Sequence, residues 1–185
     1  MFTYHSPETA PKKSKPILEN DEKAYGMIPN LSKVQAEAPA TLESYKWLYQ
    51  KFTTETSFTP LEQQIVMMTS NYENKCHYCV PAHTWIMKSA KMPEDIIEAL
   101  REGAPLQDKK LEALRVFTKE LWDNRGHIGE TKLISFLEQG YTKQQALEVL
   151  TGMACKLLSN FTNALTNNDV DQAFKSFEWV HPSDR

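Results

Sequence analysis

Two cysteines and a histidine lie close together in the segment NKCHYCVPAHTW. Cys76 and Cys79 are separated by two residues, and His83 follows the second cysteine by four residues. A two-residue spacer lets a pair of thiols close an internal disulfide, and a thiolate can attack a peroxide or another disulfide. A histidine one helical turn from a thiol can accept its proton. The spacing therefore indicates thiol redox chemistry.

Pro81 indicates where these side chains lie in a helix. Because proline has no amide hydrogen, it belongs in the first turn, which predicts a helix that starts between about Cys76 and Val80. The free amides of a helix N-terminus favour a thiolate and lower the pKa of a thiol below its usual ~8.5. Spacings of four and seven residues also allow the three side chains to share one helical face.

Metal binding and a purely structural role are the alternatives for this segment. Cys76, Cys79 and His83 supply only three metal ligands, and neither a second CxxC motif nor an HxxxH motif supplies a fourth. Elemental analysis of the isolated protein would separate the metal hypothesis from the redox hypothesis. We expect redox chemistry that needs no metal and no bound cofactor.

Four other residues carry reactive side chains, and for each a less direct role is expected. His77 and Tyr78, inside the CxxC motif, are expected to be partly exposed and to tune the thiols. Cys155 lies in the apolar run 149–158 and is expected to be a small buried hydrophobic residue. His127 follows a helix stop and is expected to be a loop residue, although a loop can bring it to the site of the same or a neighbouring subunit.

The composition is that of an ordinary globular protein with one domain. The chain has 185 residues, of which 41% are hydrophobic and 24% charged, with a net charge of −3, and no basic excess indicates nucleic-acid binding. The first residues lack an apolar stretch long enough for an export signal, and the aliphatic block at residues 65–68 is far too short to span a membrane. Three cysteines, an odd count, argue against a secreted disulfide scaffold. We expect a cytoplasmic protein that binds neither nucleic acid nor membrane.

Apolar residues recur at helical spacing through most of the chain, whereas no convincing strand pattern occurs. Thr59, Pro60 and Glu62 form a capping-box pattern that predicts a helix running to about Tyr72. Further helices are predicted over residues 40–53, 80–90, 93–103, 111–122, 130–138, 142–165 and 170–179. The expected fold is all-α, a single compact bundle of about seven or eight helices. Residues 1–20 are predicted to be an extended N-terminal arm, and residues 21–185 the all-helical domain.

Aromatic residues gather on the helix predicted near the start of the domain, in greater number than a lone bundle needs. A subunit interface would bury them, and a stable interface needs well over ~1,000 Å² of contact. The aromatic residues expected at such an interface are Tyr45, Trp47, Tyr49, Phe52 and Trp179.

The run TPLEQQIVMMTSNYENKCHYCVPAHTW resembles the alkyl hydroperoxidase D-like, or carboxymuconolactone decarboxylase, family, whose signature is a helix followed by CxxCxxxH. The likeness continues through RGHIGETKLISFLEQGYTKQQALEVLTGMACKLLSNFTNAL and DVDQAF, and covers most of the chain beyond about residue 30. It implies an all-α fold that assembles into trimers or hexamers and reduces hydroperoxides or disulfides with a thiol or dithiol electron donor. By position, Cys79 would attack the substrate, Cys76 would resolve the intermediate, and His83 would belong to a proton relay. Decarboxylation is not expected, because that branch of the family is not the CxxC branch.

Gln64 stands where the family's peroxidases usually carry a glutamate, twelve positions before the first cysteine. Glutamine cannot take up a proton. Glu62 and Glu73 lie about 200° and about 180° around the helix from Gln64, so neither is an obvious substitute. We therefore expect a slow peroxide reaction, and the alternative is a non-enzymatic oligomer that senses redox state or binds a partner.

Overall fold

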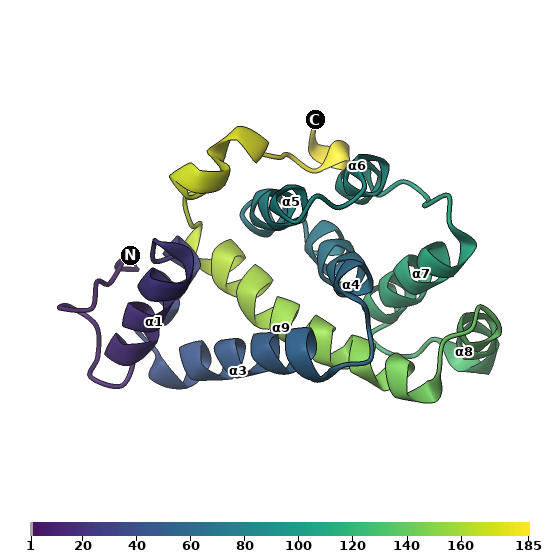
Figure 1. Cartoon of the computed structure of the whole chain (residues 1–185), viewed down its shortest axis with the longest axis horizontal. Coiled ribbons are helices and arrows are strands. Elements are labelled where there is room, and N and C mark those ends of the chain that lie inside the picture. The colour runs from purple at the N-terminus through teal and green to yellow at the C-terminus, as the bar shows by residue number, and fades with distance from the viewer. Residues whose placement is uncertain (1) are drawn as a thin grey trace.

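The computed structural model describes residues 2–185, and helices account for all the regular structure in this range (Figure 1). The nine α-helices and two 3-10 helices are α1 (Lys15–Tyr25), α2 (Asn30–Gln35), α3 (Pro39–Glu55), α4 (Pro60–Glu73), α5 (Cys79–Ser89), α6 (Glu94–Glu102), α7 (Lys109–Asp123), α8 (Gly129–Glu138), α9 (Lys143–Thr166), η1 (Gln172–Phe177) and η2 (Pro182–Asp184). The predicted all-α class is confirmed. Two N-terminal helices exceed the prediction, and the helix predicted over residues 170–179 is the shorter 3-10 helix η1.

The N-terminal segment differs from the predicted extended arm. From Lys15 it forms α1, on which Leu18 is fully buried in a cluster with Leu42 of α3. The predicted domain boundary at residue 21 therefore falls inside a helix. The helix escaped detection because its sequence, KPILENDEKAY, is short and mostly polar. Met1, the first residue of the predicted arm, lies outside the described residues.

Helix α4 lies inside the bundle and contacts α5, α7 and α9 (Figure 1). All of its residues from 62 to 71 are buried. Its start is the predicted capping box: Thr59 Oγ1 accepts the Glu62 amide at 3.3 Å, and the Glu62 carboxylate accepts the Thr59 amide at 2.9 Å. The cap fixes the first turn of the helix that carries Gln64.

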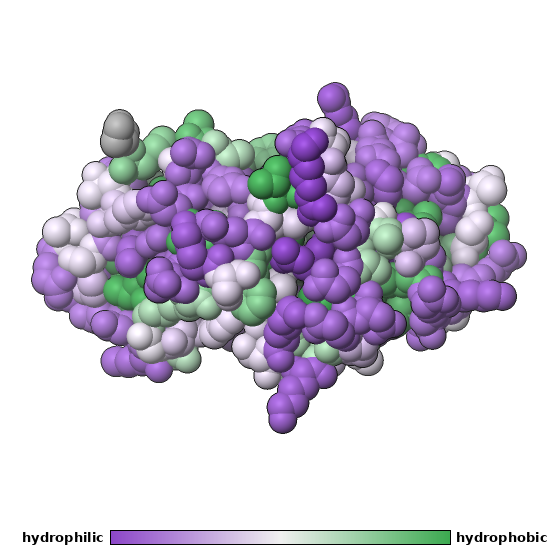
Figure 2. Space-filling view, turned by 90° about the horizontal axis from the view of Figure 1, so that it is seen from above, coloured by the Kyte–Doolittle hydropathy of each residue, from purple (hydrophilic) through white to green (hydrophobic). Residues whose placement is uncertain are grey.

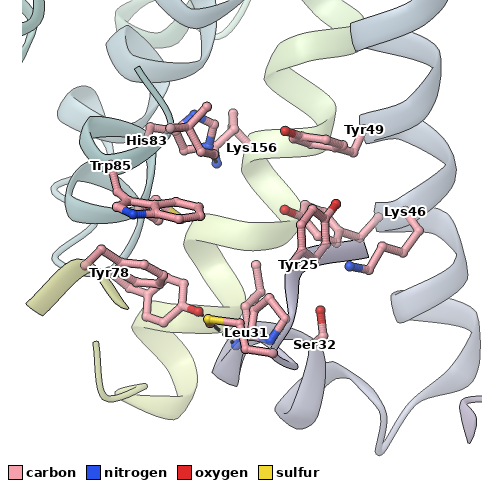
Figure 3. Close-up of a pocket in the computed structure, with 16 residues that line it drawn as sticks. Tyr25, Leu31, Ser32, Lys46, Tyr49, Tyr78, His83, Trp85 and Lys156 are labelled. Atoms are coloured by element: carbon pink, nitrogen blue, oxygen red, sulfur yellow. Dashed lines mark hydrogen bonds between the residues drawn. The ribbon is translucent and has the colours of Figure 1, made fainter. Parts of the chain in front are cut away.

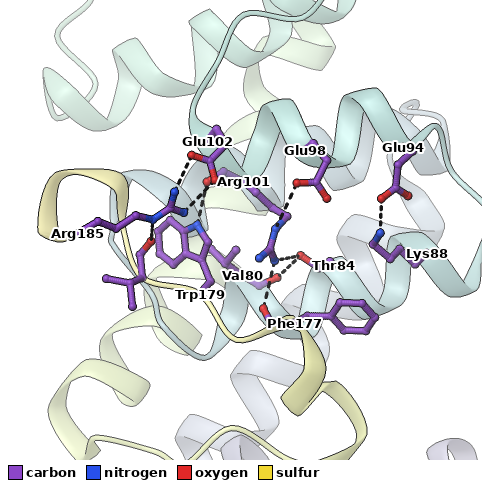
Figure 4. A network of polar contacts seen from close by, with 11 residues as sticks. Val80, Thr84, Lys88, Glu94, Glu98, Arg101, Glu102, Phe177, Trp179 and Arg185 are labelled. Carbon is purple, nitrogen blue, oxygen red and sulfur yellow. Dashed lines mark hydrogen bonds and ion pairs between the residues drawn. The ribbon is translucent and has the colours of Figure 1, made fainter.

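The C-terminal segment passes over the outer side of α5 and α6 (Figure 4). Arg101 of α6 donates hydrogen bonds to Thr84 Oγ1 of α5 at 2.8 Å and to the carbonyl oxygen of Phe177 at 3.2 Å. Trp179 Nε1 donates to the carbonyl oxygen of Arg101 at 2.9 Å. These bonds hold α5 between the C-terminal segment and the rest of the bundle, which fixes the helix that begins at Cys79.

The surface is uneven in character. On the face shown in Figure 2, hydrophilic side chains predominate and apolar ones are interspersed. On α9, by contrast, every exposed position from 147 to 165 carries an apolar residue. The largest of these side chains are Leu147, Leu150, Leu157, Phe161 and Leu165. Among residues 2–185, no helix combines the length and apolarity that crossing a membrane requires.

Candidate active site

A cavity of about 270 Å³ lies between α3, α5 and α9, and residues 25–32 contribute part of its wall (Figure 3). Most of the wall is aromatic or aliphatic, and no acidic side chain of the described residues lines it. The side chains in the wall that could react or carry charge come from three helices: Lys46 from α3, Cys79 and His83 from α5, and Lys156 from α9. The remaining lining residues are Tyr25, Met27, Pro29, Leu31, Ser32, Tyr45, Tyr49, Tyr78, Ala82, Trp85, Ile86 and Phe174.

Cys79 is the first residue of α5, so the helix starts where Pro81 predicted. It is also the one of the two motif cysteines that lines the cavity, whereas Cys76 lies in the preceding turn. Cys76 Sγ accepts a hydrogen bond from the Cys79 amide at 3.3 Å. Both thiols are buried and free. Among residues 2–185, no three His, Cys, Asp or Glu side chains are arranged to hold a metal ion.

The surroundings give the two thiols opposite protonation states. Burial by itself raises the pKa of Cys79, but the hydrogen bond from the Cys76 side chain and the positive charge of Lys156 outweigh burial and lower the pKa of Cys79 to about 5. Burial and the same hydrogen bond to Cys79 raise the pKa of Cys76 well above its usual range. At neutral pH, Cys79 is therefore the thiolate and Cys76 the thiol.

Asn163 of α9 donates a further hydrogen bond to the thiolate. Its Nδ2 lies 3.2 Å from Cys79 Sγ and 3.8 Å from Cys76 Sγ. Asn168 Nδ2 donates to Asn163 Oδ1 at 2.7 Å, which turns the amide so that its N–H groups face the sulfurs. His77 Nε2 lies 2.8 Å from the carbonyl oxygen of Asn168, so His77 contacts the segment that orients this amide.

Both ring nitrogens of His83 are bonded to groups other than Cys79. Its Nδ1 lies 2.8 Å from Gln64 Oε1, and its Nε2 lies 3.0 Å from Lys156 Nζ. Because the glutamine oxygen only accepts, Nδ1 carries the hydrogen, and Nε2 accepts from the lysine ammonium. Burial and the Lys156 charge hold the pKa of His83 well below its usual range. His83 is neutral, and the expected direct transfer of a proton from Cys79 to His83 has no hydrogen bond to follow.

Gln64 contacts His83 from the position that the resemblance assigns to a relay acid. The two neighbouring acids point elsewhere. Glu62 is engaged in the Thr59 cap, and Glu73 forms an ion pair with Lys119 at 2.9 Å. The helix geometry correctly predicted that neither replaces Gln64.

Lys156 is the main residue of the site that the sequence analysis missed. Its side chain is only 1% exposed, and a lysine is almost never that buried without a partner. The available signal was a lone lysine inside the apolar run 149–158 of a predicted helix. Lys46 also lines the cavity, but its Nζ lies 2.6 Å from both carboxylate oxygens of Asp21, which neutralises its charge.

Tyr78 is buried, in contrast to the predicted partial exposure, because its hydroxyl joins two distant segments. It donates to Asp171 Oδ2 at 2.5 Å and accepts from the Leu31 amide at 3.3 Å. The Asn30 amide also donates to Asp171, at 3.1 Å. The CxxC spacer thus ties the start of α2 to the cavity wall.

The remaining residues that the sequence analysis named lie on the surface, in the cavity wall or in the core. His127 is an exposed loop residue and does not line this cavity. Cys155 is fully buried, as predicted, and burial raises its pKa to about 11. Of the aromatic residues expected at a subunit interface, only Trp47 is largely exposed. The others line the cavity (Tyr45 and Tyr49) or are buried in the core (Phe52 and Trp179).

Comparison with known proteins identifies the fold. No family and no curated protein matches the sequence, but several solved structures match the chain closely in shape. An alkylhydroperoxidase AhpD core structure, an uncharacterized peroxidase-related protein from Ralstonia eutropha JMP134, has a TM-score of 0.83 and 16% identity, over 94% of this chain and 93% of that chain. An uncharacterized peroxidase-related protein from Silicibacter sp. TM1040 has a TM-score of 0.79 and 19% identity, over 94% and 91%.

A third solved structure, a variant of the debrominase Bmp8 in complex with 2,3,4-tribromopyrrole, has a TM-score of 0.74 and 14% identity, over 89% of each chain. One fold thus occurs in proteins described as peroxidase-related and in a debrominase. At these identities the likeness concerns the fold, and the chemistry has to be argued from the site. The chain has the all-α fold of the alkylhydroperoxidase AhpD core.

Proposed function

We propose that this protein reduces hydroperoxides or disulfides through the Cys79 and Cys76 pair, with a thiol or dithiol as electron donor. The observation that carries the proposal is the placement of a thiolate in the wall of an apolar cavity with a protonated thiol directly behind it. The thiolate is the nucleophile in such reactions, and a second thiol in reach resolves the intermediate.

The reaction divides into oxidation and re-reduction. The Cys79 thiolate attacks the terminal oxygen of a hydroperoxide, the O–O bond breaks, and Cys79 becomes a sulfenic acid while an alkoxide leaves and is protonated to the alcohol. Cys76 then attacks the Cys79 sulfur, which forms the disulfide and releases water. A dithiol donor restores both thiols through a mixed disulfide. A disulfide substrate would enter the same cycle at the attack by Cys79.

The cavity supports an organic substrate. Its volume of about 270 Å³ has room for more than a water molecule, and its wall is largely aromatic. Apolar surface of this kind favours the organic part of a hydroperoxide over water. We place the protein in the cytoplasm, where thiol and dithiol donors keep such pairs reduced.

A coupled assay tests the proposal. Reduced protein is offered cumene hydroperoxide, hydrogen peroxide or a small disulfide, with dihydrolipoamide, a thioredoxin-type protein or dithiothreitol as donor. We expect Cys79→Ser to lower consumption to the uncatalysed rate, whereas Cys155→Ala, which changes a buried cysteine outside the cavity, keeps turnover. Equal hydroperoxide consumption by Cys79→Ser and the parent protein would refute the proposal.

A non-enzymatic redox sensor is the second candidate, and Gln64 favours it. A neutral amide bonds to His83 where a carboxylate would complete a proton relay, and no acidic side chain of the described residues lines the cavity. A sensor would form and break the Cys76 to Cys79 disulfide reversibly while none of the donors sustained turnover.

A halogenated aromatic compound is a further candidate substrate, since the debrominase Bmp8 shares the fold. The aromatic wall beside the Cys79 thiolate is the feature of this chain that favours it. Incubation with 2,3,4-tribromopyrrole and a dithiol tests it directly. Release of bromide that depends on Cys79 supports this activity, and its absence leaves hydroperoxide or disulfide reduction as the proposal.

We also propose that the chain forms a homo-oligomer, a trimer or a hexamer, through the apolar stripe of α9. Leu165 is 75% exposed and Phe161 53% exposed, and no polar residue interrupts the exposed positions between 147 and 165. Contiguous apolar surface of this kind marks protein interfaces. A second copy fits it because stripes of identical leucines can pack against one another around a symmetry axis.

A further inference from the structure

Lys156 is a buried cation of the cavity wall, and among the described residues of the wall only one anion is available to balance its charge. Lys156 is 1% exposed, and its hydrogen-bond partner is the neutral imidazole of His83. Lys46, the other cation in the wall, is neutralised by Asp21, and no carboxylate of the described residues lines the cavity. The Cys79 thiolate is therefore the anion that balances Lys156. A buried charge requires such a partner.

Oxidation removes this partner. When the Cys79 thiolate attacks the hydroperoxide, it becomes a neutral sulfenic acid, and an ammonium group without a counter-charge is left in an apolar cavity. Desolvation then disfavours the charged form of the lysine. At the same moment the leaving alkoxide requires a proton, and Lys156 lines the cavity in which the alkoxide is released.

We propose that Lys156 gives its proton to the alkoxide that leaves when Cys79 attacks the hydroperoxide, so that the buried site is neutral both before and after oxidation. The inference rests on the proposed hydroperoxide reaction and deepens it. The balance closes without solvent protons: thiolate, thiol, ammonium and ROOH become disulfide, neutral amine, ROH and water. Two electrons pass from the two sulfurs to the O–O bond.

His83 and Gln64 position the lysine for this step. The neutral imidazole offers Nε2 as an acceptor because Nδ1 donates to Gln64, and a lysine N–H can keep this bond whether the amine is charged or neutral. A carboxylate at position 64 would instead favour a protonated imidazole, which has no lone pair for the lysine. Glutamine at this position, unexpected for a histidine relay, is the residue that a lysine proton donor requires.

No other group around Lys156 is placed to titrate near neutral pH. The three buried tyrosines of the wall and the neighbouring Cys155 all have raised pKa values, chiefly through desolvation: Tyr45, Tyr49, Tyr78 and Cys155. Tyr25 has a raised pKa for the same reason, and the pKa of His83 is lowered. Lys46 is held in its ion pair with Asp21. His77, between the two cysteines, is hydrogen-bonded to the Asn168 carbonyl oxygen and does not line the cavity. Among the residues that line the cavity, Cys79 and Lys156 therefore determine how the proton count of the site changes on oxidation.

The equilibrium constant between the protein disulfide and dithiothreitol, measured as a function of pH, reports this proton count in the intact protein. If oxidised protein holds a neutral Lys156, reduction by the dithiol moves two protons onto the protein, one to Cys76 and one to Lys156, and the equilibrium constant is independent of pH. If Lys156 stays charged throughout, one proton is released to solvent, and the constant rises tenfold for each pH unit. Absorbance of the Cys79 thiolate near 240 nm is recorded in the same samples.

The expected result for the parent protein is a thiolate at pH 7 and an equilibrium constant that changes less than about twofold from about pH 6 to about pH 7.5. Lys156→Arg keeps the positive charge but cannot release a proton, so its constant should rise about tenfold per pH unit. Lys156→Met, a second variant, should lose the thiolate absorbance. Three results would overturn the proposal. The first is an equilibrium constant that rises tenfold per pH unit in the parent protein, and the second is a pH-independent constant in a folded Lys156→Arg variant that retains the thiolate. The third is a pH-independent constant in a parent protein that shows no thiolate absorbance. A different result would refute the proposed function itself, namely hydroperoxide turnover that persists in Cys79→Ser.

Discussion

Cys79 and Cys76 are three positions apart, yet their surroundings assign them different chemistry. Cys79 faces the cavity, accepts from Asn163 Nδ2 at 3.2 Å and is attracted to the Lys156 charge. Cys76 lies behind it, away from the cavity, and burial keeps it protonated. The thiolate that lines the cavity and the thiol behind it are therefore separate residues, and the proposed function gives them the attacking and resolving roles in the order that the resemblance implies.

The protonation of Cys79 gives the first prediction. Because the pKa of Cys79 is lowered to about 5, the thiolate is present above that pH and disappears as the pH falls through it. Absorbance near 240 nm, compared with that of Cys79→Ser, should titrate with a midpoint near pH 5. Lys156→Met removes the attracting charge and should move the midpoint up toward the ~8.5 of an ordinary thiol. A midpoint near that ordinary value in the parent protein would contradict the assignment.

The state of His83 gives the second prediction. Gln64→Glu places a carboxylate at the oxygen that lies 2.8 Å from His83 Nδ1, and an adjacent negative charge favours the protonated imidazole. The pKa of His83 should rise by about one to three units, measured by NMR of the imidazole carbon protons. Gln50→Glu, at an exposed position of α3, serves as the control for added charge. An unchanged His83 titration in Gln64→Glu would show that the two side chains do not interact as described.

How much of the site could be predicted depends on sequence separation. Cys76, Cys79 and His83 lie within two helical turns, so spacing and Pro81 were enough to bring them together. Lys156 and Asn163 come from α9, and only the packing of α9 against α4 brings them to the cysteines. A lone lysine inside an apolar run is unusual, but nothing local shows which distant site this lysine, or an asparagine of the same helix, belongs to.

At the scale of elements, α9 makes the site possible by packing close to α3 and α4. A Cβ atom at Gly152 would lie 2.8 Å from the ring of Phe52 and 2.8 Å from Val66 Cγ1, closer than side chains approach in practice. Only glycine lets the three helices meet at this distance. The same helix presents Lys156 to the cavity one turn later.

Gly152→Ala gives the third prediction. The added methyl forces Phe52 and Val66 apart, at a cost of about 1 to 3 kcal/mol, which exceeds the ~0.5 to 1 kcal/mol that alanine gains over glycine within a helix. The net loss of unfolding free energy should be about 1 kcal/mol, measured by urea denaturation at fixed protein concentration. Phe52→Leu combined with Gly152→Ala should recover part of the loss, and the double-mutant cycle measures how much. A Gly152→Ala protein as stable as the parent would contradict the close contact.

The helices whose first turns carry capping residues or proline were the ones that the sequence predicted. The capping box at Thr59 and the helix start near Pro81 both occur where the sequence placed them. Helices α1 and α2 were missed because they are short and have few apolar residues. Their burial depends on distant contacts: Leu18 of α1 packs with Leu42 of α3, and α2 packs against α3 and α9. For that reason the part of the cavity wall supplied by residues 25–32 could not be anticipated.

At the scale of the whole molecule, the apolar stripe of α9 gives the fourth prediction. The parent protein should be a trimer or a hexamer by analytical ultracentrifugation, and Leu157→Lys combined with Leu165→Lys should shift it to the monomer, because two lysines would be buried without partners. Thr131→Lys, at an exposed position of α8, should leave the oligomer intact. A monomeric parent protein would contradict the proposed oligomer, and an oligomer that survives both substitutions on α9 would place the interface elsewhere.

The central claim is that Cys79 reacts with the substrate and Cys76 resolves it. A single-turnover experiment tests this most directly: reduced protein is mixed with one equivalent of cumene hydroperoxide, and the products are identified by mass spectrometry. We expect one equivalent of alcohol and a disulfide between Cys76 and Cys79 in the parent protein, a sulfenic acid trapped on Cys79 in Cys76→Ser, and no oxidation in Cys79→Ser. Oxidation of Cys76 alone, or unchanged alcohol formation in Cys79→Ser, would contradict the account.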